Sequence, residues 1–314
     1  MRIAIIDAWR ERWRLSPVFQ PERLASRADY AAPQRSKMLE QRRTYVSNLT
    51  PADQQPFSVP GYCQPCQRQV ALQVDFAYAY PVDGRLQPNW RERLLCPHCR
   101  LNSRIRATLH LFERFVGARR RDLLYLTEQN TSLYRWMADR YPNLTGSEYL
   151  GSEFQPGQVD ARGWRHEDLT RLSFADASLS AILSFDVLEH VPDYPAAARE
   201  CLRCLKPGGV FVFSVPFIVE AQETLVRARL GSDGQIEHLH PPEYHGDPVS
   251  DAGCLCYYHF GWELLDQLRD LGFVDVTALD YWSAAHGYLG GNTLLFTARK
   301  PAVSMISFRT VAQT

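Results

Sequence analysis

Four cysteines lie in two pairs that have the spacing of zinc ligands. Cys63 and Cys66 form one Cys-x2-Cys pair, Cys96 and Cys99 form the other, and 29 residues separate the pairs. Two such pairs can bring four thiolates to the tetrahedral arrangement that suits Zn²⁺. Four thiolate ligands leave no open coordination position, so the zinc would be structural rather than catalytic. We therefore predict a small zinc ribbon over residues 61–104.

The other four cysteines follow apolar patterns instead of ligand spacing. Cys201 and Cys204 lie three apart in a helical segment, and Cys254 and Cys256 alternate with Leu255 as residues of a strand do. Buried thiols in such positions behave as small apolar side chains. We predict that these four cysteines pack in the protein interior.

A histidine-rich segment is the second place where side chains could do chemistry. Residues 234–248 hold three of the nine histidines, together with Glu243 and Asp247. Histidine exchanges a proton near neutral pH and also binds metal ions. The segment could therefore supply a general base oriented by a carboxylate or ligands for a divalent ion, or the histidines could only cap turns.

Alternating strands and helices must position these residues. From about residue 122 to 300, short apolar runs alternate with amphipathic helical segments, which is typical of a mainly parallel, doubly wound α/β sheet. Residues 1–60 read as an irregular arm, apart from one helix. The expected strands are 123–127, 144–149, a short one at 166–170, 181–185, 210–215, 274–281 and 293–298.

Two neighbouring segments carry a family resemblance. Residues 183–193 contain Glu189-His190-Val191-Pro192, and a strand follows the turn Lys206-Pro207-Gly208-Gly209. They resemble the fourth and fifth strands of class I S-adenosylmethionine-dependent methyltransferases, especially the branch that includes ubiquinone O-methyltransferases. The resemblance implies a Rossmann-like, doubly wound seven-stranded sheet over residues 105–300, with S-adenosylmethionine as the methyl donor.

The resemblance also implies where the methyl donor binds. Glu128 and Glu148 correspond to acidic groups after the first and second strands, and Asp168 to a group that contacts adenine. The loop 127–132 lacks the glycines that are usual in the family, which is the largest departure from the pattern. The implied donor-binding residues are Thr127, Glu128, Gln129, Asn130, Glu148, Tyr149, Asp168, Leu169, Phe185 and Asp186.

Three histidines are candidates for the catalytic base. His190 lies at the mouth of the donor site in the resembling enzymes, and His240 and His245 belong to the histidine-rich segment. Methyl transfer is an in-line displacement, for which the enzyme positions the nucleophile and, for a hydroxyl, removes its proton. We expect one of these three histidines to do so.

Composition limits the compartment and the partners. Lys+Arg and Asp+Glu are both 35, so no overall basic field favours nucleic acid. The segment Met1–Asp7 lacks the apolar run of a secretory signal, and no run is long enough to cross a membrane. We expect a cytoplasmic protein, without a membrane partner. The expected parts are an arm (1–60), the zinc ribbon (61–104), a methyltransferase domain (105–300) and a tail (301–314).

The hypothesis is O-methylation of a small molecule or saccharide. One alternative is an RNA-modifying methyltransferase whose zinc ribbon clamps the RNA, and neutral charge argues against it. Another is a non-catalytic binding protein on a methyltransferase scaffold, which the glycine-free loop would favour.

Overall fold

The chain divides into two units that are described separately below. The structure is a computed structural model that describes residues 19–247, 249, 252–291 and 293–302. The first unit combines the chain up to Ala118 with Thr277–Phe296, and the second combines Arg119–Val276 with the chain from Thr297 onward. Most of the predicted tail and the first part of the predicted arm lie outside the described residues. The predicted domain boundaries stay predictions.

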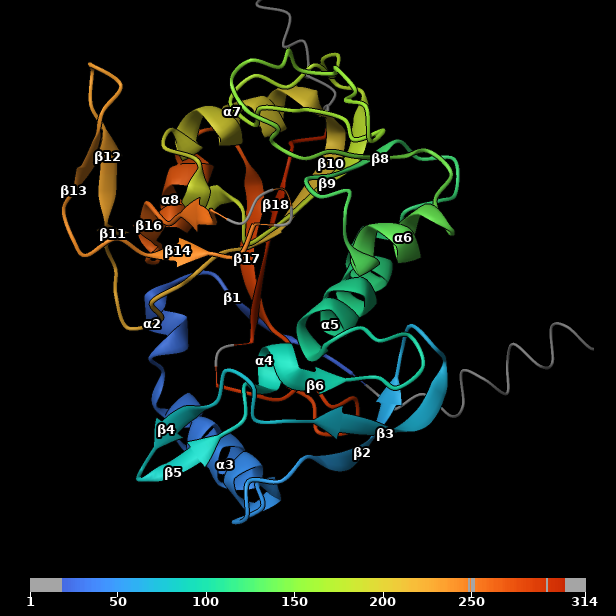
Figure 1. Cartoon of the computed structure of the whole chain (residues 1–314), viewed down its shortest axis with the longest axis vertical. Helices are drawn as coiled ribbons and strands as arrows, with labels where there is room; N and C mark the ends of the chain where they lie inside the picture. The colour runs from blue at the N-terminus through green and yellow to red at the C-terminus, as the bar shows by residue number, and fades with distance from the viewer. Residues whose placement is uncertain (1–18, 248, 250–251, 292, 303–314) are drawn as a thin grey trace, which may run out of the picture. The chain divides into compact units, whose positions relative to one another are not determined.

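The central sheet has the strand order β1-β17-β18-β10-β9-β7-β8. β9 and β10 run side by side and parallel (Figure 1). β7 is parallel to both β8 and β9. The Rossmann-like α/β class with a mostly parallel sheet is thus confirmed. Its strands are β1 (Glu22–Leu24), β7 (Leu124–Leu126), β8 (Leu144–Gly146), β9 (Leu179–Phe185), β10 (Leu205–Ser214), β17 (Val274–Asp280) and β18 (Leu294–Arg299).

One strand of the sheet differs from the sequence prediction. The expected short strand at 166–170 is reduced to two isolated bridges, Glu148 with His166 and Asp168 with Arg171. Asp168 accepts hydrogen bonds from the backbone N and Oγ1 of Thr170, and this local turn competes with an extended strand. The seventh strand is β1, which pairs antiparallel with β17 from Glu22 to Leu24.

Three capped or amphipathic helices belong to the second unit. Thr131 accepts a hydrogen bond from the N of Tyr134 at the start of one helix, and Asp193 accepts from the N of Ala196 at another. These side chains satisfy amide groups that have no partner within the helix. The helices are α6 (Ser132–Ala138), α7 (Tyr194–Cys204) and α8 (Glu263–Asp270).

Short strand pairs follow β10 in the second unit. β11 pairs with β16, β12 with β13, and β14 with β15. The β12–β13 pair forms a ribbon that projects at the left of Figure 1. The pairs are β11 (Leu225–Val226) with β16 (Tyr258–His259), β12 (Ala228–Leu230) with β13 (Ile236–His238), and β14 (Tyr244–His245) with β15 (Cys254–Leu255).

The first unit is built on a hairpin and its packed helices. β2 and β3 form an antiparallel hairpin, and β6 extends it. Its core includes Val59, Leu72, Trp90 and Leu94. The elements are α2 (Arg27–Tyr30), α3 (Pro33–Leu49), β2 (Phe57–Cys63), β3 (Arg68–Val74), β4 (Tyr80–Val82), β5 (Arg85–Gln87), α4 (Trp90–Arg93), β6 (Leu94–Leu95) and α5 (Ser103–Leu111), which continues as a π-helical turn (Phe112–Val116). Within the described part of the chain, none of the helices has the length and apolar character needed to cross a membrane.

The buried carboxylate of Asp280, at the end of β17, pairs with two arginines of the first unit. Asp280 is 3% exposed, and its Oδ2 lies 2.7 Å from Arg35 Nη2 and 2.6 Å from Arg42 Nη1. Thr293 donates to the other oxygen at 2.6 Å. Arg35 is itself 2% exposed, so its guanidinium depends on this carboxylate and on Glu22.

Replacing this carboxylate should destabilise the protein strongly. Asp280→Ala leaves the buried Arg35 cation short of a partner, which costs about 3–5 kcal/mol of unfolding free energy. Urea unfolding followed by circular dichroism measures the loss. Asp270→Ala, at an exposed position at the end of α8, is the control and should change the unfolding free energy by less than about 0.5 kcal/mol. Equal effects of the two substitutions would contradict the role given to Asp280.

Candidate functional site

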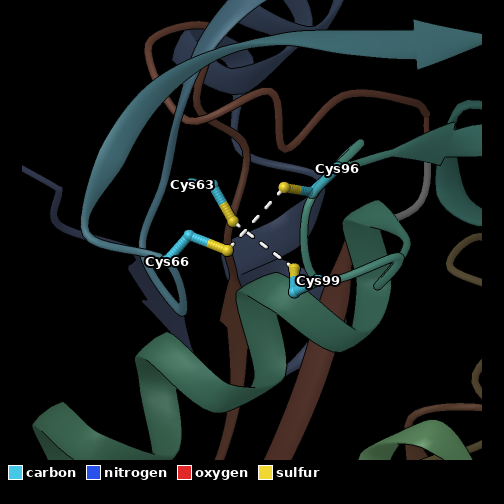
Figure 2. A group of neighbouring side chains, drawn as sticks. All are labelled: Cys63, Cys66, Cys96 and Cys99. Carbon is cyan, nitrogen blue, oxygen red and sulfur yellow. Dashed lines mark hydrogen bonds between the residues drawn. The ribbon is translucent and has the colours of Figure 1, made fainter.

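The four predicted cysteines converge in the first unit. Figure 2 shows Cys63, Cys66, Cys96 and Cys99 with their sulfur atoms pointing toward one another. The Sγ atoms of Cys63 and Cys99 are 3.7 Å apart, and those of Cys66 and Cys96 are 3.9 Å apart. A tetrahedral site with Zn–S bonds of about 2.3 Å has sulfur–sulfur edges of about 3.8 Å. None of these four cysteines forms a disulfide bond. Their sulfur atoms are therefore available to bind a zinc ion at the observed separations.

The two cysteine pairs lie in similar turns. Gln67 follows Cys66 with φ +53°, and Arg100 follows Cys99 with φ +62°. The N of Gln67 donates to the O of Gln64, and the N of Arg100 donates to the O of Cys96. Each turn thus uses a left-handed residue directly after its second cysteine to reverse the chain. Neither position is a glycine, so this conformation could not be predicted from residue type.

The loop after β7 is held by a buried carboxylate. Glu148 is 6% exposed, and its Oε1 accepts hydrogen bonds from the N of Gln129 at 2.8 Å and of Asn130 at 2.7 Å. Thr127 begins the loop, with its N donating to the O of Leu183 and its Oγ1 to Ser184. Burial raises the pKa of Glu148, while the two amides oppose the rise. These bonds fix the path of the loop that the sequence analysis predicted to bind the methyl donor.

The loop does not need the glycines that it lacks. None of its residues from Thr127 to Thr131 has a positive φ. The close approach occurs instead at Gly146, the last residue of β8. A Cβ there would lie 2.5 Å from the ring of Tyr134 and 2.8 Å from the O of Glu128. The glycine that lets the chain pass closely is therefore on the neighbouring strand.

Most of the other predicted donor-binding residues lie at or just beyond the ends of neighbouring strands. Asp186 follows β9 with φ +53° and accepts from Ser214 Oγ at 2.9 Å. Phe185 and Leu169 are buried, whereas Tyr149 is 59% exposed with its ring 5.3 Å from that of His166. Because β7, β8 and β9 are parallel neighbours, their carboxyl ends meet at one edge, where ligands bind in open α/β sheets.

A buried carboxylate brings together two of the predicted histidines. Glu189 is fully buried, and its Oε1 lies 3.7 Å from His190 Nε2 and 3.6 Å from His245 Nδ1. The two rings meet edge to face with centroids 4.9 Å apart. Neither carboxylate oxygen has a hydrogen-bond partner within normal distance. Desolvation accordingly raises the pKa of Glu189, which the two histidines oppose.

The two histidines differ in what they can do with a proton. His190 Nδ1 lies 2.8 Å from the O of Leu255, and a carbonyl oxygen only accepts, so Nδ1 carries the hydrogen and Nε2 is free to take a proton. The pKa of His245 is raised to about 11, first by Cys256 and then by Glu189, against the effect of burial. The two ring nitrogens of His245 face Glu189 and Glu243, whereas Nε2 of His190 carries no hydrogen in this tautomer, so His190 is the candidate base. His240 is exposed between β13 and β14 and is not a member of the group.

A second group adjoins the first through His245. Glu243 Oε1 lies 3.0 Å from His245 Nε2 and 3.1 Å from His259 Nε2, and Glu243 Oε2 pairs with Arg227. Cys256 is buried beside these side chains, and the imidazoles of His245 and His259 lower its pKa despite its burial.

The sequence prediction treated Cys256 as a packing residue and did not single out His259 or Arg227. A signal was present, because Cys256 and His259 have the Cys-x2-His spacing of metal ligands. The packing expected for Cys201 and Cys204 agrees with their complete burial.

The close approach at Gly146 gives a direct test of the donor-loop geometry. Gly146→Ala forces the added methyl against the Tyr134 ring and the Glu128 carbonyl, which should cost about 1–3 kcal/mol of stability. Thermal unfolding by differential scanning fluorimetry would show the loss. Gly246→Ala is the control, because a Cβ there meets nothing within 4 Å. If Gly146→Ala behaved like Gly246→Ala, the loop would not pack as described.

Known proteins match parts of the chain. Residues 132–213 match the family model described as methyltransferase domain. A Mycolicibacterium smegmatis protein described as a probable S-adenosylmethionine-dependent methyltransferase is 44% identical over 52 residues, which cover 17% of this chain and 20% of that protein. The malonyl-[acyl-carrier protein] O-methyltransferase of Serratia marcescens is 27% identical over 146 residues, which cover 43% and 52%.

The matched regions are partial. The chain spans from a fifth to about half of the length of these two relatives. An S-adenosylmethionine-dependent methyltransferase structure from Mesorhizobium loti aligns with a TM-score of 0.37 and 18% identity, over 57% of this chain and 91% of that one. An overlap at that score adds nothing to the fold assignment. The strand order and the family match carry it: residues 132–213 have the pattern of the methyltransferase domain family on a Rossmann-like sheet.

Proposed function

We propose that this protein transfers a methyl group from S-adenosylmethionine to a hydroxyl of a small molecule or saccharide. The observation that carries the proposal is the edge formed by the ends of β7, β8 and β9. Glu148, which lies within the residues that match the family, holds there the loop that directly precedes them. The match covers only part of the chain, so the activity of the whole protein is the proposal.

The donor would bind along this edge. Glu148 accepts both loop amides through Oε1, so we assign Oε2 to the ribose hydroxyls. Asp168 and Leu169 would meet the adenine, with Thr127, Glu128, Gln129, Asn130, Tyr149, Phe185 and Asp186 lining the remainder. When bound, S-adenosylmethionine supplies an activated methyl group, and the chain has only to orient it.

We assign His190 as the base that takes the proton from the acceptor hydroxyl. Its Nδ1 donates to the O of Leu255, which fixes the ring and points Nε2 toward the Glu189 side of the cluster. Glu189 lies close enough to stabilise the imidazolium that forms when Nε2 takes the proton. His245, whose ring nitrogens face Glu189 and Glu243, would balance the charge of these carboxylates rather than act as a second base.

We also propose that the four clustered cysteines bind a structural Zn²⁺. The sulfur–sulfur distances match a tetrahedral site, and four thiolates give the ion no open position for a substrate. The ion would join the β2–β3 hairpin to the loop before α5 and so stabilise the first unit.

Donor binding and proton transfer can be tested separately. Isothermal calorimetry should show S-adenosylmethionine binding to the wild type and unchanged binding to His190→Gln. Transfer of labelled methyl groups to a panel of hydroxylated metabolites and saccharides should fall about 10²–10⁴-fold in His190→Gln. His238→Gln, at an exposed position on β13, is the control.

Three other outcomes would contradict parts of the proposal. Absence of donor binding would contradict the enzyme assignment and favour a non-catalytic scaffold. Label transferred to RNA instead of the small-molecule panel would contradict the proposed acceptor class. Full activity in His190→Gln would remove that residue from the mechanism.

Zinc in the cysteine cluster can be tested by elemental analysis. Cys66→Ser should lower the zinc content by one ion per chain and the melting temperature along with it, because a structural zinc contributes to folding. The control is His98→Gln, since His98 is exposed inside the second cysteine pair and is not a member of the cluster. Unchanged zinc content in Cys66→Ser would refute this site.

A further inference from the structure

The second unit contains another set of metal-type ligands, separate from the four clustered cysteines. One ligand atom from each of Glu243, Cys256 and His259 lies within 4.8 Å of the others. The Glu243 Oε1–His259 Nε2 distance is 3.1 Å. A tetrahedral site with bonds of about 2.0–2.1 Å has edges of about 3.3 Å between nitrogen and oxygen ligands. The two side chains are therefore already close to the separation that one shared ion requires.

Backbone pairing holds the three side chains in place. The N of Cys256 donates to the O of Glu243 at 2.8 Å, just beyond the β14–β15 pair. His259 lies on β16, where it pairs with Leu225 of β11. Cys256 and His259 are also three residues apart, so one short segment of the chain supplies two of the ligands. The group is thus preorganised by main-chain hydrogen bonds, which lowers the entropic cost of binding an ion.

The charges around the group also favour a cation. Arg227 holds Glu243 Oε2 at 3.3 Å and leaves Oε1 to the two imidazoles. His245 connects Glu243 to Glu189, which is fully buried with both oxygens lacking a hydrogen bond. The two carboxylates and the thiol of Cys256 therefore depend on Arg227 and the histidines to balance their negative charge. A buried carboxylate without hydrogen bonds is costly unless a cation lies nearby.

We propose that Glu243, Cys256 and His259 bind one zinc-class divalent ion, with His245 as the link between this site and Glu189. The sulfur, nitrogen and oxygen donors suit Zn²⁺ and disfavour Mg²⁺ or Ca²⁺, which prefer oxygen alone. Three protein ligands leave one coordination position open, unlike the closed cysteine cluster. Glu243 and His259 are 35% and 23% exposed, so an ion can reach them from solvent.

The adjoining group of Glu189, His190 and His245 is less suited to bind a zinc-class ion. Its carboxylate is fully buried, and it contains no thiol to select a zinc-class ion. The proposal concerns metal binding only and stands whether or not the protein transfers methyl groups.

Zinc content of the full-length chain tests the proposal. The decisive comparison is Cys256→Ser against Cys254→Ser, because Cys254 lies two residues away on the same segment but outside the ligand group. After dialysis against zinc and removal of the excess, mass spectrometric metal analysis should show one ion per chain fewer in Cys256→Ser than in Cys254→Ser. His259→Gln should lose the same ion, and His238→Gln should keep it.

Cobalt provides a second readout that does not depend on how the variants fold when loaded with zinc. Titration of metal-free Cys66→Ser, where the other cluster is disrupted, with Co²⁺ should give a thiolate charge-transfer band that weakens when Cys256→Ser is added and stays unchanged when Cys254→Ser is added. Equal zinc content in Cys256→Ser and Cys254→Ser would overturn the proposal. Loss of the ion in Glu189→Gln but not in Cys256→Ser would also overturn it, because the ion would then belong to the neighbouring group.

Discussion

Buried charge that needs a nearby partner is the constraint on which both units depend. Asp280 is buried because Arg35 and Arg42 reach the same oxygen. Glu189 is buried with only two imidazoles near it and no hydrogen bond of normal length. Desolvating a carboxylate without compensation costs several kcal/mol. The elements around each of these groups therefore have to bring cationic side chains to a fixed point.

The edge of the sheet where we propose that the methyl donor binds shows the same constraint in a milder form. Glu148 is buried at the end of β8 and finds its partners in two amides of the loop after β7. This pairing explains how a loop without glycine can keep a defined path. Gly146 supplies the close approach that a glycine in the loop would otherwise provide. The neighbouring strand thus supplies both the close backbone approach and the carboxylate that holds the loop, and a search confined to the loop misses them.

The sequence predicted local patterns well and long-range encounters poorly. The Cys-x2-Cys pairs and the apolar strands from β7 to β10 were expected, because fixed spacing and buried periodicity are local properties. The strand expected at 166–170 was wrong, because Asp168 bonds to Thr170 within its own turn. β1 could not be foreseen, since three residues near the start of the chain pair with a strand more than 250 residues later.

By itself, the sequence determined the fold class, the four cysteines and His190 as residues of interest, because spacing and resemblance are properties of the chain alone. Only the tertiary structure joined His190 to His245 through Glu189 and separated both from His240. It also placed Cys256 and His259 beside Glu243, which the apolar pattern around them had hidden. The physical reason is that a site depends on distances between side chains, and chain folding sets these distances where residues far apart in sequence meet.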